Sequence, residues 1–408
     1  MTGAEESVGV TMVSEANEPG SESRKRSDDR RGVPEGTPQE GGASNHLAAR
    51  LSPRSPGSFA AAAMAYSDSL LERAAWHAWT GRTPSARALR AALAPAALAY
   101  GAVAALRNRL YDAGWLDAAR VPAHVVSVGN LAVGGTGKTP TALWLAERLA
   151  ARGLRTGIVA RGYRKRRRGV VIVGEDGRPL VDPEEGGDEA VLLARRFAGP
   201  VVTGERRAEA AAVACARFAL DALVLDDGFQ HRALVRDADL VLVSGETVGA
   251  WPLPAGPLRE PLEGLARARA LLALDGPAGA PRSRPLFRGR LVATALVHVV
   301  ADRAWQEEPL AALRGARVVA VAGVARPERF LATLAEAGAR VERMLRFPDH
   351  HAYRAADAAR IAAAAGEGFV VTTEKDLVKL GRIPGLRAVR VSLEVDDAER
   401  LVDLLLAR

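Results

Sequence analysis

The sequence predicts an α/β protein built on a parallel sheet, with a smaller second α/β domain and an N-terminal helical segment. Three features indicate this fold. Short apolar runs that end in Gly or Asp alternate with helical stretches, which is typical of buried parallel strands and their crossover helices. A glycine-rich loop lies between one such strand and a helix. The pattern of a strand followed by a polar loop then starts again at about residue 286.

Residues 1–63 are predicted to be a disordered, low-complexity tail, because Gly, Ser, Pro, Glu and Arg dominate them and large apolar residues are few. The segment lacks the charged start and apolar core of a signal peptide. Order is expected to begin at Met64, with a helical segment and the first α/β domain over residues 64–285. The second domain is expected over residues 286–408.

The helical pattern from Ser69 to Trp115 contains an uncharged run from Ala91 to Leu106. The run includes Pro95 and Gly101, and it is shorter than the ~20 residues that a membrane span needs. Arginines flank it on both sides. Two interpretations stay open: a helix lying in an anionic membrane interface, or an alanine-rich helix packed on the neighbouring domain.

The first domain then follows in a regular order. A strand in AHVVSVGN precedes the glycine-rich loop, residues 140–152 are helical, and residues 156–160 form a second strand. The apolar runs GPVVTG, DALVLDDG, ADLVLVSG and ARALLALDG lie among helical stretches at 189–197 and 206–219. In such a sheet, ligands gather at the carboxyl ends of the strands. In the second domain, RGRLVATALVHVV is predicted to be a strand, and it is a candidate connector.

The glycine-rich loop, residues 128–140, reads VGNLAVGGTGKTP, and its position between a strand and a helix is the context of a P-loop. Glycines let backbone N–H groups turn inward around phosphate oxygens, and the helix N-terminus adds partial positive charge. Lys138 would neutralise the β- and γ-phosphates, and the Thr139 hydroxyl would ligate Mg²⁺. Ala132 departs from the common pattern, which has glycine there. The predicted nucleotide-binding residues are Gly134, Gly135, Thr136, Gly137, Lys138 and Thr139. The predicted domain is therefore P-loop NTPase-like.

Carboxylates follow two of the predicted elements. Asp226 and Asp227 stand directly after a buried-looking strand, where a P-loop enzyme places its second metal-binding carboxylate. On its own, Asp-Asp-Gly is a common turn, but beside the glycine-rich loop the pair is the predicted Mg²⁺ site, with one of the two as ligand. Asp188 in GGDEA fits a helix N-cap, because a carboxylate stabilises that end of a helix.

Polar groups in three further loops are candidates for chemistry. Asp349, His350 and His351 follow a strand of the second domain, and histidine exchanges protons near neutral pH. They also suggest a metal, although no further ligand sits nearby in the sequence. Arg259 in LPAGPLREP is suited either to reach a phosphate or to form a structural salt bridge. The basic run at 164–168 is either a solvated loop or a surface for anionic lipid or substrate phosphate.

Composition narrows the function classes. The net charge of +8 suits nucleotide, nucleic acid or anionic lipid as partner, but nucleic-acid binding rests on this charge alone. A single cysteine, Cys215, excludes a disulfide framework and a cysteine-cluster metal site. Only five of the 56 basic residues are lysines, which makes Lys138 a specific signal. The absence of an Asn-Lys-x-Asp guanine signature argues against a GTPase, whereas a membrane-bound switch ATPase stays an alternative.

The motifs together resemble one family, the tetraacyldisaccharide 4'-kinases, which are the lipid A 4'-kinases of Gram-negative bacteria. The resemblance runs from about Trp79 to the C-terminus, with the motifs in the family's order. They are VGNLAVGGTGKTP, ARGYR, GDEA, VVTGERR, DDGFQH, LPAGPLREP, FPDHHAY and TTEKD. This set is far more specific than a P-loop alone, and Ala132 is compatible with it because the family's loop is itself atypical there.

The resemblance implies Mg²⁺-dependent transfer of a phosphoryl group from ATP to the 4'-hydroxyl of tetraacyldisaccharide 1-phosphate, giving lipid IVA. It implies two α/β domains that close over the nucleotide. It also implies peripheral attachment to the cytoplasmic face of the inner membrane, with no nucleic acid as partner.

The resemblance also assigns roles to individual residues. The resemblance changes the interpretation of Asp188 from a helix cap to the catalytic base, which His350 would support. Lys138 would neutralise the phosphates. The acidic pair of the family's DDGFQH motif corresponds to Asp226 and Asp227, which are assigned as metal-binding residues. The arginines of GERR and LREP are assigned to the substrate as Arg207 and Arg259.

Overall fold

The computed structural model describes residues 83–245, 247, 249–274, 284–300, 304–364 and 369–407, together with 75, 79 and 81. The chain divides into two units, Met1–Pro53 and Arg54–Arg408, and all described residues belong to the second unit. The predicted disordered tail, residues 1–63, lies outside the described residues.

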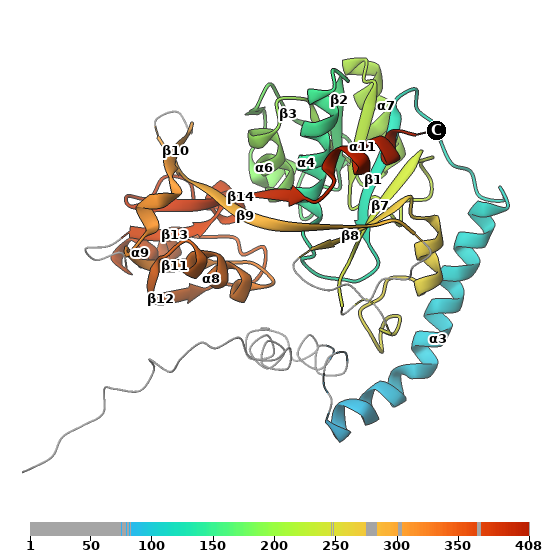
Figure 1. Cartoon of the computed structure of the whole chain (residues 1–408), viewed down its shortest axis with the longest axis horizontal. Helices are drawn as coiled ribbons and strands as arrows, with labels where there is room; N and C mark the ends of the chain where they lie inside the picture. The colour runs from blue at the N-terminus through green and yellow to red at the C-terminus, as the bar shows by residue number, and fades with distance from the viewer. Residues whose placement is uncertain are drawn as a thin grey trace, which may run out of the picture. The chain divides into compact units, whose positions relative to one another are not determined.

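The described strands form one sheet of 14 strands, and the centre of this sheet is parallel (Figure 1). In spatial order, the parallel strands are β8 (Ala270–Leu274), β7 (Ala238–Val243), β1 (His124–Asn130), β6 (Ala222–Asp226), β2 (Thr156–Ala160) and β5 (Val201–Thr203). The antiparallel strands β3 (Val171–Glu175) and β4 (Arg178–Pro179) extend the sheet beyond β5. This arrangement confirms the predicted α/β class with a parallel sheet.

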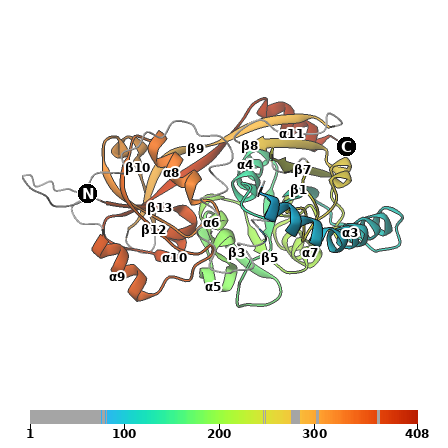
Figure 2. The same cartoon turned by 90° about the horizontal axis from the view of Figure 1, so that it is seen from below.

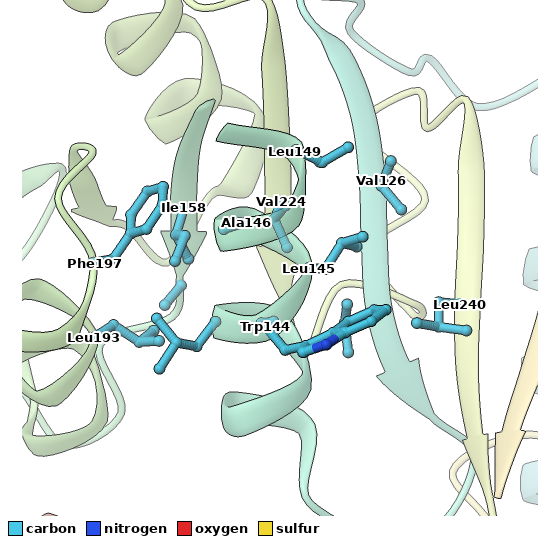
Figure 3. Packing of buried hydrophobic residues seen from close by; sticks show 14 of the residues in the cluster. Val126, Trp144, Leu145, Ala146, Leu149, Ile158, Leu193, Phe197, Val224 and Leu240 are labelled. Atoms are coloured by element: carbon cyan, nitrogen blue, oxygen red, sulfur yellow. The ribbon is translucent and has the colours of Figure 1, made fainter. Parts of the chain in front are cut away.

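Helices cover both faces of the parallel strands. Successive strand residues point to opposite faces, so Val126 of β1 joins one apolar cluster and Val125 joins another. The first cluster contains α4, α6 and α11, and the second contains α7. Figure 3 shows Trp144 and Leu145 of α4 packed in the first cluster. These helices are α4 (Lys138–Ala151), α6 (Asp188–Arg196), α7 (Arg207–Phe218) and α11 (Ala398–Leu406), with the short α5 (Pro183–Gly186) before α6.

The second half of the sheet is also of α/β type, as predicted. In spatial order, its strands are β12 (Arg340–Arg346), β11 (Arg317–Ala322), β13 (Phe369–Thr373), β14 (Leu386–Val395) and β9 (Leu286–Val299), and β10 (Trp305–Pro309) pairs with β9. The first four are parallel to their neighbours, whereas β14 pairs antiparallel with β9. The helices are α8 (Pro327–Glu336), α9 (Ala355–Ala364) and α10 (Glu374–Leu380), with 3-10 turns at Leu310–Leu313 and, in the first half, Leu262–Arg267.

The strand β9 connects the two halves, as its position in the sequence suggested. Its first residues, 286–289, pair in parallel with β8, and residues 289–297 then pair with β14 (Figure 1). The chain also returns after β14, because Leu401 and Leu405 of α11 pack in the cluster formed by α4. The proposed boundary at residue 286 stays a prediction, since the backbone crosses between the halves twice.

The N-terminal helix α3 (Pro84–Asp112) is longer than the uncharged run indicated. It starts at Thr83, whose hydroxyl accepts a hydrogen bond from Ala86 N at 3.2 Å, and it continues through Pro95 for 29 residues. By length and composition alone, with a mean hydropathy of 1.5 in its most apolar part, α3 is long enough to cross a membrane. The uncharged run alone is shorter than a span, but the helix that contains it is not.

Candidate active site

The phosphate-loop candidate connects the end of β1 to the start of α4, where the sequence predicted it. Gly134 and Gly137 have φ values of 111° and 88°, a region that strongly favours glycine. A Cβ on Gly137 would lie 2.6 Å from Leu274 Cδ1, so a larger residue there would also require the Leu274 side chain to move. The loop thereby turns directly ahead of the N-terminus of α4, which begins at Lys138.

Asn130, the last residue of β1, holds this loop and its lysine. Its Nδ2 donates to Ala132 O at 2.6 Å and to Thr136 Oγ1 at 2.8 Å. Its Oδ1 accepts from Lys138 Nζ at 3.2 Å, and Nζ also lies 3.4 Å from Gly134 O. Lys138 is therefore aimed across the mouth of the loop. Sequence reasoning missed Asn130, although its place between strand and loop is a usable signal.

Ala132 fits the loop because its backbone is paired rather than tightly turned. It forms an antiparallel bridge with Leu258, and the neighbouring Val133 N donates to Pro257 O at 2.9 Å. Arg259 N donates to Leu131 O at 2.7 Å in the same pairing. This extended pairing accommodates a Cβ, which explains the departure from glycine.

Asp226 presents one unsatisfied oxygen next to the phosphate loop. Its Oδ2 accepts from Thr139 Oγ1 at 2.9 Å, but the buried Oδ1 has no hydrogen-bond partner among the described residues. Burial, followed by the charges of Glu189 and Asp227, raises the pKa of Asp226 to about 7. A divalent cation would satisfy the free oxygen and favour the ionised form, so the donor set of Thr139 and Asp226 fits Mg²⁺.

Asp227 has a different environment from its neighbour. Arg259 Nη1 donates to both of its oxygens, at 2.9 and 3.0 Å, and Lys138 Nζ lies 3.8 Å from Oδ1. Burial alone would raise the pKa of Asp227, but these two cations outweigh burial and hold the pKa below its usual value. The sequence left two roles open for Arg259, phosphate binding or a structural salt bridge, and the structure contains the salt bridge.

Arg207 lies near the acidic pair with an incomplete set of partners. The residue is 3% exposed, and its Nη1 donates to Gly204 O at 2.9 Å. Its Nε and Nη2 have no hydrogen-bond partner among the described residues. Burial lowers the pKa of Arg207 to about 10. Two buried guanidinium donors are therefore available for an anion.

Asp188 and His350 meet although 162 residues separate them in the chain. His350 Nδ1 lies 2.9 Å from Asp188 Oδ2 and 3.2 Å from Oδ1. Asp188 is the first residue of α6, and the N-cap residue before it is Gly187. The predicted N-cap is therefore displaced by one residue, but the carboxylate does lie at the helix start, where Asp188 Oδ1 accepts a hydrogen bond from Glu189 N at 2.9 Å while also facing the imidazole.

Two lysines of α10 complete this second group, and sequence reasoning missed both. Lys375 Nζ lies 3.0 Å from His350 Nε2, and Lys379 Nζ lies 3.7 Å from Asp188 Oδ2. Lys375 Nζ also contacts Glu189 Oε1 at 3.2 Å. Because the charge of Glu189 also raises the pKa of Asp226, Glu189 links this group to the acidic pair. The rarity of lysine was the signal that could have identified both residues.

The remaining predicted loops have structural partners. His351 Nε2 lies 3.0 Å from Asp357 Oδ2, which removes it from the group around His350. In the described part of the chain, no group of three or more His, Cys, Asp or Glu side chains could hold a metal ion, so the metal reading of FPDHHAY has no support. In the basic run, Arg166 pairs with Glu184 at 2.6 Å, and Lys165 contacts Gly169 O and Glu205.

A buried ion-pair network holds α10 against α6, and these helices lie side by side (Figure 2). Glu374 Oε2 accepts from Arg196 Nη1 at 2.7 Å, and Oε1 accepts from Arg390 Nε at 3.0 Å. We expect Glu374→Ala to lower the free energy of unfolding by about 3 kcal/mol, because two largely buried guanidinium groups would lose their carboxylate. Urea denaturation followed by circular dichroism measures this.

Glu307→Ala is the matched control for that substitution. Glu307 also pairs with Arg390, but its side chain is 61% exposed, so its loss should cost less than about 1 kcal/mol. Equal destabilisation by the two substitutions would contradict a special role for the buried Glu374.

Comparison with known proteins gives one consistent family. The family model described as Tetraacyldisaccharide-1-P 4'-kinase matches residues 89–408. A tetraacyldisaccharide 4'-kinase of Anaeromyxobacter dehalogenans (strain 2CP-1 / ATCC BAA-258) is 44% identical over 338 residues, covering 76% of this chain and 88% of that protein. The enzyme of the same name from Azoarcus sp. (strain BH72) is 44% identical over 307 residues, covering 74% and 85%.

A solved structure gives the same result. The "apo" form of LpxK from Aquifex aeolicus, in complex with ATP, matches with a TM-score of 0.66 and 32% sequence identity. The match covers 78% of this chain and 98% of that chain.

Proposed function

The chain belongs to the tetraacyldisaccharide-1-P 4'-kinase family, and on that premise we propose that it phosphorylates the 4'-hydroxyl of tetraacyldisaccharide 1-phosphate to give lipid IVA. ATP is the proposed donor, as the ATP bound to the Aquifex aeolicus relative suggests. The observation that carries this proposal is the contact of the acidic pair with Lys138 and Thr139 of the phosphate loop, with Asp188 and His350 linked to that pair through Glu189.

The nucleotide phosphates are proposed to bind to the N–H groups of residues 134–139, with Lys138 neutralising the β- and γ-phosphates. Thr139 and Asp226 would hold Mg²⁺, with Asp227 next to them. Support comes from the buried, unpartnered Oδ1 of Asp226 and from the hydrogen bond that already joins it to Thr139. The cation, when bound, neutralises phosphate charge.

Asp188 is the proposed base. As the 4'-hydroxyl oxygen attacks the γ-phosphorus, the bond to the leaving ADP oxygen breaks and the hydroxyl proton passes to the Asp188 carboxylate. Burial alone would raise the pKa of Asp188. The hydrogen bond from His350 and the charges of Lys375 and Lys379 outweigh burial, so the pKa lies below its usual value. Asp188 is therefore ionised at neutral pH and ready to accept a proton.

Two arginines are proposed to bind substrate phosphate groups. Arg207 has two buried donors without partners among the described residues, as an anion site requires. Arg259 pairs with Asp227 in this structure, so contact with a phosphate would require it to share or exchange that partner.

A direct test of the proposed reaction is a single-turnover incubation with γ-labelled ATP, Mg²⁺ and tetraacyldisaccharide 1-phosphate in detergent micelles. We expect the label to move from ATP to the lipid. Release of the label only as free phosphate would overturn the proposed acceptor and favour the switch ATPase. Transfer to the existing 1-phosphate, giving a 1-diphosphate, or to another free hydroxyl would overturn the proposed regiochemistry.

Helix α3 is proposed to attach the enzyme to the cytoplasmic face of the inner membrane as a peripheral element. Its apolar side chains are unusually exposed: Leu98 is 63%, Val103 67% and Leu106 56% exposed. Polar contacts bind other residues of α3 to the kinase loops, with Tyr100 Oη donating to Arg259 O at 2.8 Å and Asn108 Nδ2 donating to Glu260 at 2.7 Å. A helix held in this way favours lying along the membrane surface over crossing it.

Replacing Leu98, Val103 and Leu106 together with glutamine is expected to weaken partitioning to anionic liposomes by about 100-fold, because three apolar side chains would leave the lipid. Vesicle flotation measures the bound fraction. Val213→Gln is the control, since Val213 is 40% exposed on α7 and lies on another helix. Retention of wild-type protein in vesicles after alkaline carbonate extraction would contradict peripheral attachment.

A further inference from the structure

The environment of His350 contains a contact that its support of Asp188 does not require. Lys375 Nζ lies 3.0 Å from His350 Nε2, the ring nitrogen that faces away from Asp188. The same ammonium lies 3.1 Å from Asp349 Oδ1 and 3.2 Å from Glu189 Oε1. The side chain of Lys375 is 17% exposed, so water competes weakly for these contacts.

We propose that Lys375 is a positioning residue that fixes His350 as a neutral imidazole with its proton on Nδ1. A lysine ammonium has three donors and no acceptor. A ring nitrogen at hydrogen-bond distance from it must therefore be the acceptor, which assigns the lone pair to Nε2 and the hydrogen to Nδ1. The Nδ1–H group then donates to Asp188 Oδ2, 2.9 Å away. This inference rests on the proposed role of Asp188 as base.

The charge on Lys375 is well supported. Burial by itself would lower the pKa of the Lys375 ammonium, but the carboxylates of Glu189, Asp349 and Asp188 outweigh burial and raise it. Lys375 therefore stays protonated at neutral pH and cannot accept a proton from the ring.

The other groups facing His350 show what Lys375 prevents. Asp349 Oδ2 lies 3.8 Å from Nε2 and Asp188 lies against Nδ1, so two carboxylates flank the ring. The Tyr163 ring packs against the imidazole of His350, with 4.9 Å between the ring centroids. The Arg164 guanidinium lies over the Tyr163 ring, 5.5 Å from its centroid. Without an ammonium at Nε2, the two carboxylates would stabilise an imidazolium.

An imidazolium would alter the reaction at Asp188. A carboxylate paired with a full positive charge is a weaker base than one that accepts a hydrogen bond from a neutral ring. By occupying Nε2, Lys375 keeps the imidazole neutral and leaves Asp188 with a hydrogen-bond donor that fixes its orientation. Lys379 contributes a second cation 3.7 Å from Asp188, but no contact joins it to the His350 ring in the described structure.

The test is nuclear magnetic resonance of the full chain with isotope-labelled histidine, in the absence of substrate. His350→Gln assigns the ring signals. At pH 7.5 we expect the wild-type ring to be the Nδ1–H tautomer. In Lys375→Met we expect the ring to take up a proton at a pH higher by about one unit or more, which is roughly a tenfold change in the protonation equilibrium.

Kinetics give a second readout. Relative to wild type, kcat of Lys375→Met should be reduced more at pH 6 than at pH 9, by about tenfold, since the imidazolium loses its proton as the pH rises. The KM for ATP should stay unchanged, because Lys375 does not contact the phosphate loop in the described structure. Lys375→Arg keeps a cationic donor and should restore the wild-type tautomer.

Lys379→Met is the matched control, because it removes a cation from the same helix without touching the ring. It should leave the tautomer and protonation of His350 as in wild type. An Nε2–H tautomer or an imidazolium in the wild-type protein at pH 7.5 would overturn the proposal, even if Lys375→Met fails to fold. So would an unchanged titration in a folded Lys375→Met. Since the spectra need no lipid, their outcome is independent of the proposed acceptor.

Discussion

Asp188→Asn is expected to lower kcat by roughly 10²–10⁴-fold, the usual contribution of a positioned general base. The substitution preserves the shape of the side chain and its capacity to accept the hydrogen bond from His350 Nδ1, which lies 2.9 Å from Oδ2. It removes the charge that accepts the proton of the 4'-hydroxyl. ATP affinity should change little, because in the described structure Asp188 contacts α10 and His350 rather than the phosphate loop. Single-turnover transfer, together with equilibrium binding of a fluorescent ATP analogue, measures both quantities.

Glu184→Gln is the control for that substitution. Glu184 is a carboxylate only four residues earlier in the chain, and its side chain is 66% exposed in an ion pair with Arg166. Its loss should leave kcat within about twofold, because exposed ion pairs contribute little. Wild-type turnover in Asp188→Asn would rule out Asp188 as the base. A loss of ATP affinity equal to the loss of kcat would instead assign the residue to nucleotide binding.

The parts of the fold that follow from local sequence were predictable. The strand ending at Asn130 and the helix starting near Lys138 follow from an apolar run, glycines and a lysine, and the structure has both. The pairing of β9 with β14, and the return of α11 to the first half, depend on contacts between residues far apart in the chain. Local periodicity carries no information on such contacts. The helix α3 lies within the helical pattern predicted from Ser69 to Trp115, and Pro95 lies inside the helix without ending it.

The candidate site shows the same limit. Loop glycines and acidic residues after strands are visible in the sequence because their spacing reflects their chemistry. The place of Asp188 at the start of a helix was visible too, but its contact with His350 was not, because the imidazole lies 162 residues away in the chain. Lys375 and Lys379 lie four residues apart on α10, which is a common spacing on any helix. Only their rarity in an arginine-rich chain distinguished them, and only the folded chain brings them to His350 and Asp188.

Lys138→Met is expected to lower kcat by roughly 10³-fold, comparable to removing one preorganised donor from a site that stabilises developing charge. Lys138 is held by Asn130 Oδ1 at 3.2 Å and Gly134 O at 3.4 Å, and its side chain is 13% exposed, so its charge acts where water screens it little. Methionine keeps the length of the side chain and removes the ammonium. ATP should bind more weakly while adenosine binding stays unchanged, because only the phosphates face the lysine.

The control for Lys138→Met is a second substitution on α4. Arg148→Met removes a cation from the same helix, but its side chain is 48% exposed, so kcat should stay within about twofold. Loss of the Lys138 ammonium also leaves Asn130 Oδ1 without that donor, so the thermal midpoint must be compared with wild type. A large fall in the midpoint would make the loop structure the cause. An unchanged midpoint with wild-type turnover would exclude Lys138 from phosphoryl transfer, and an unchanged midpoint with the expected loss would locate its effect in the charge.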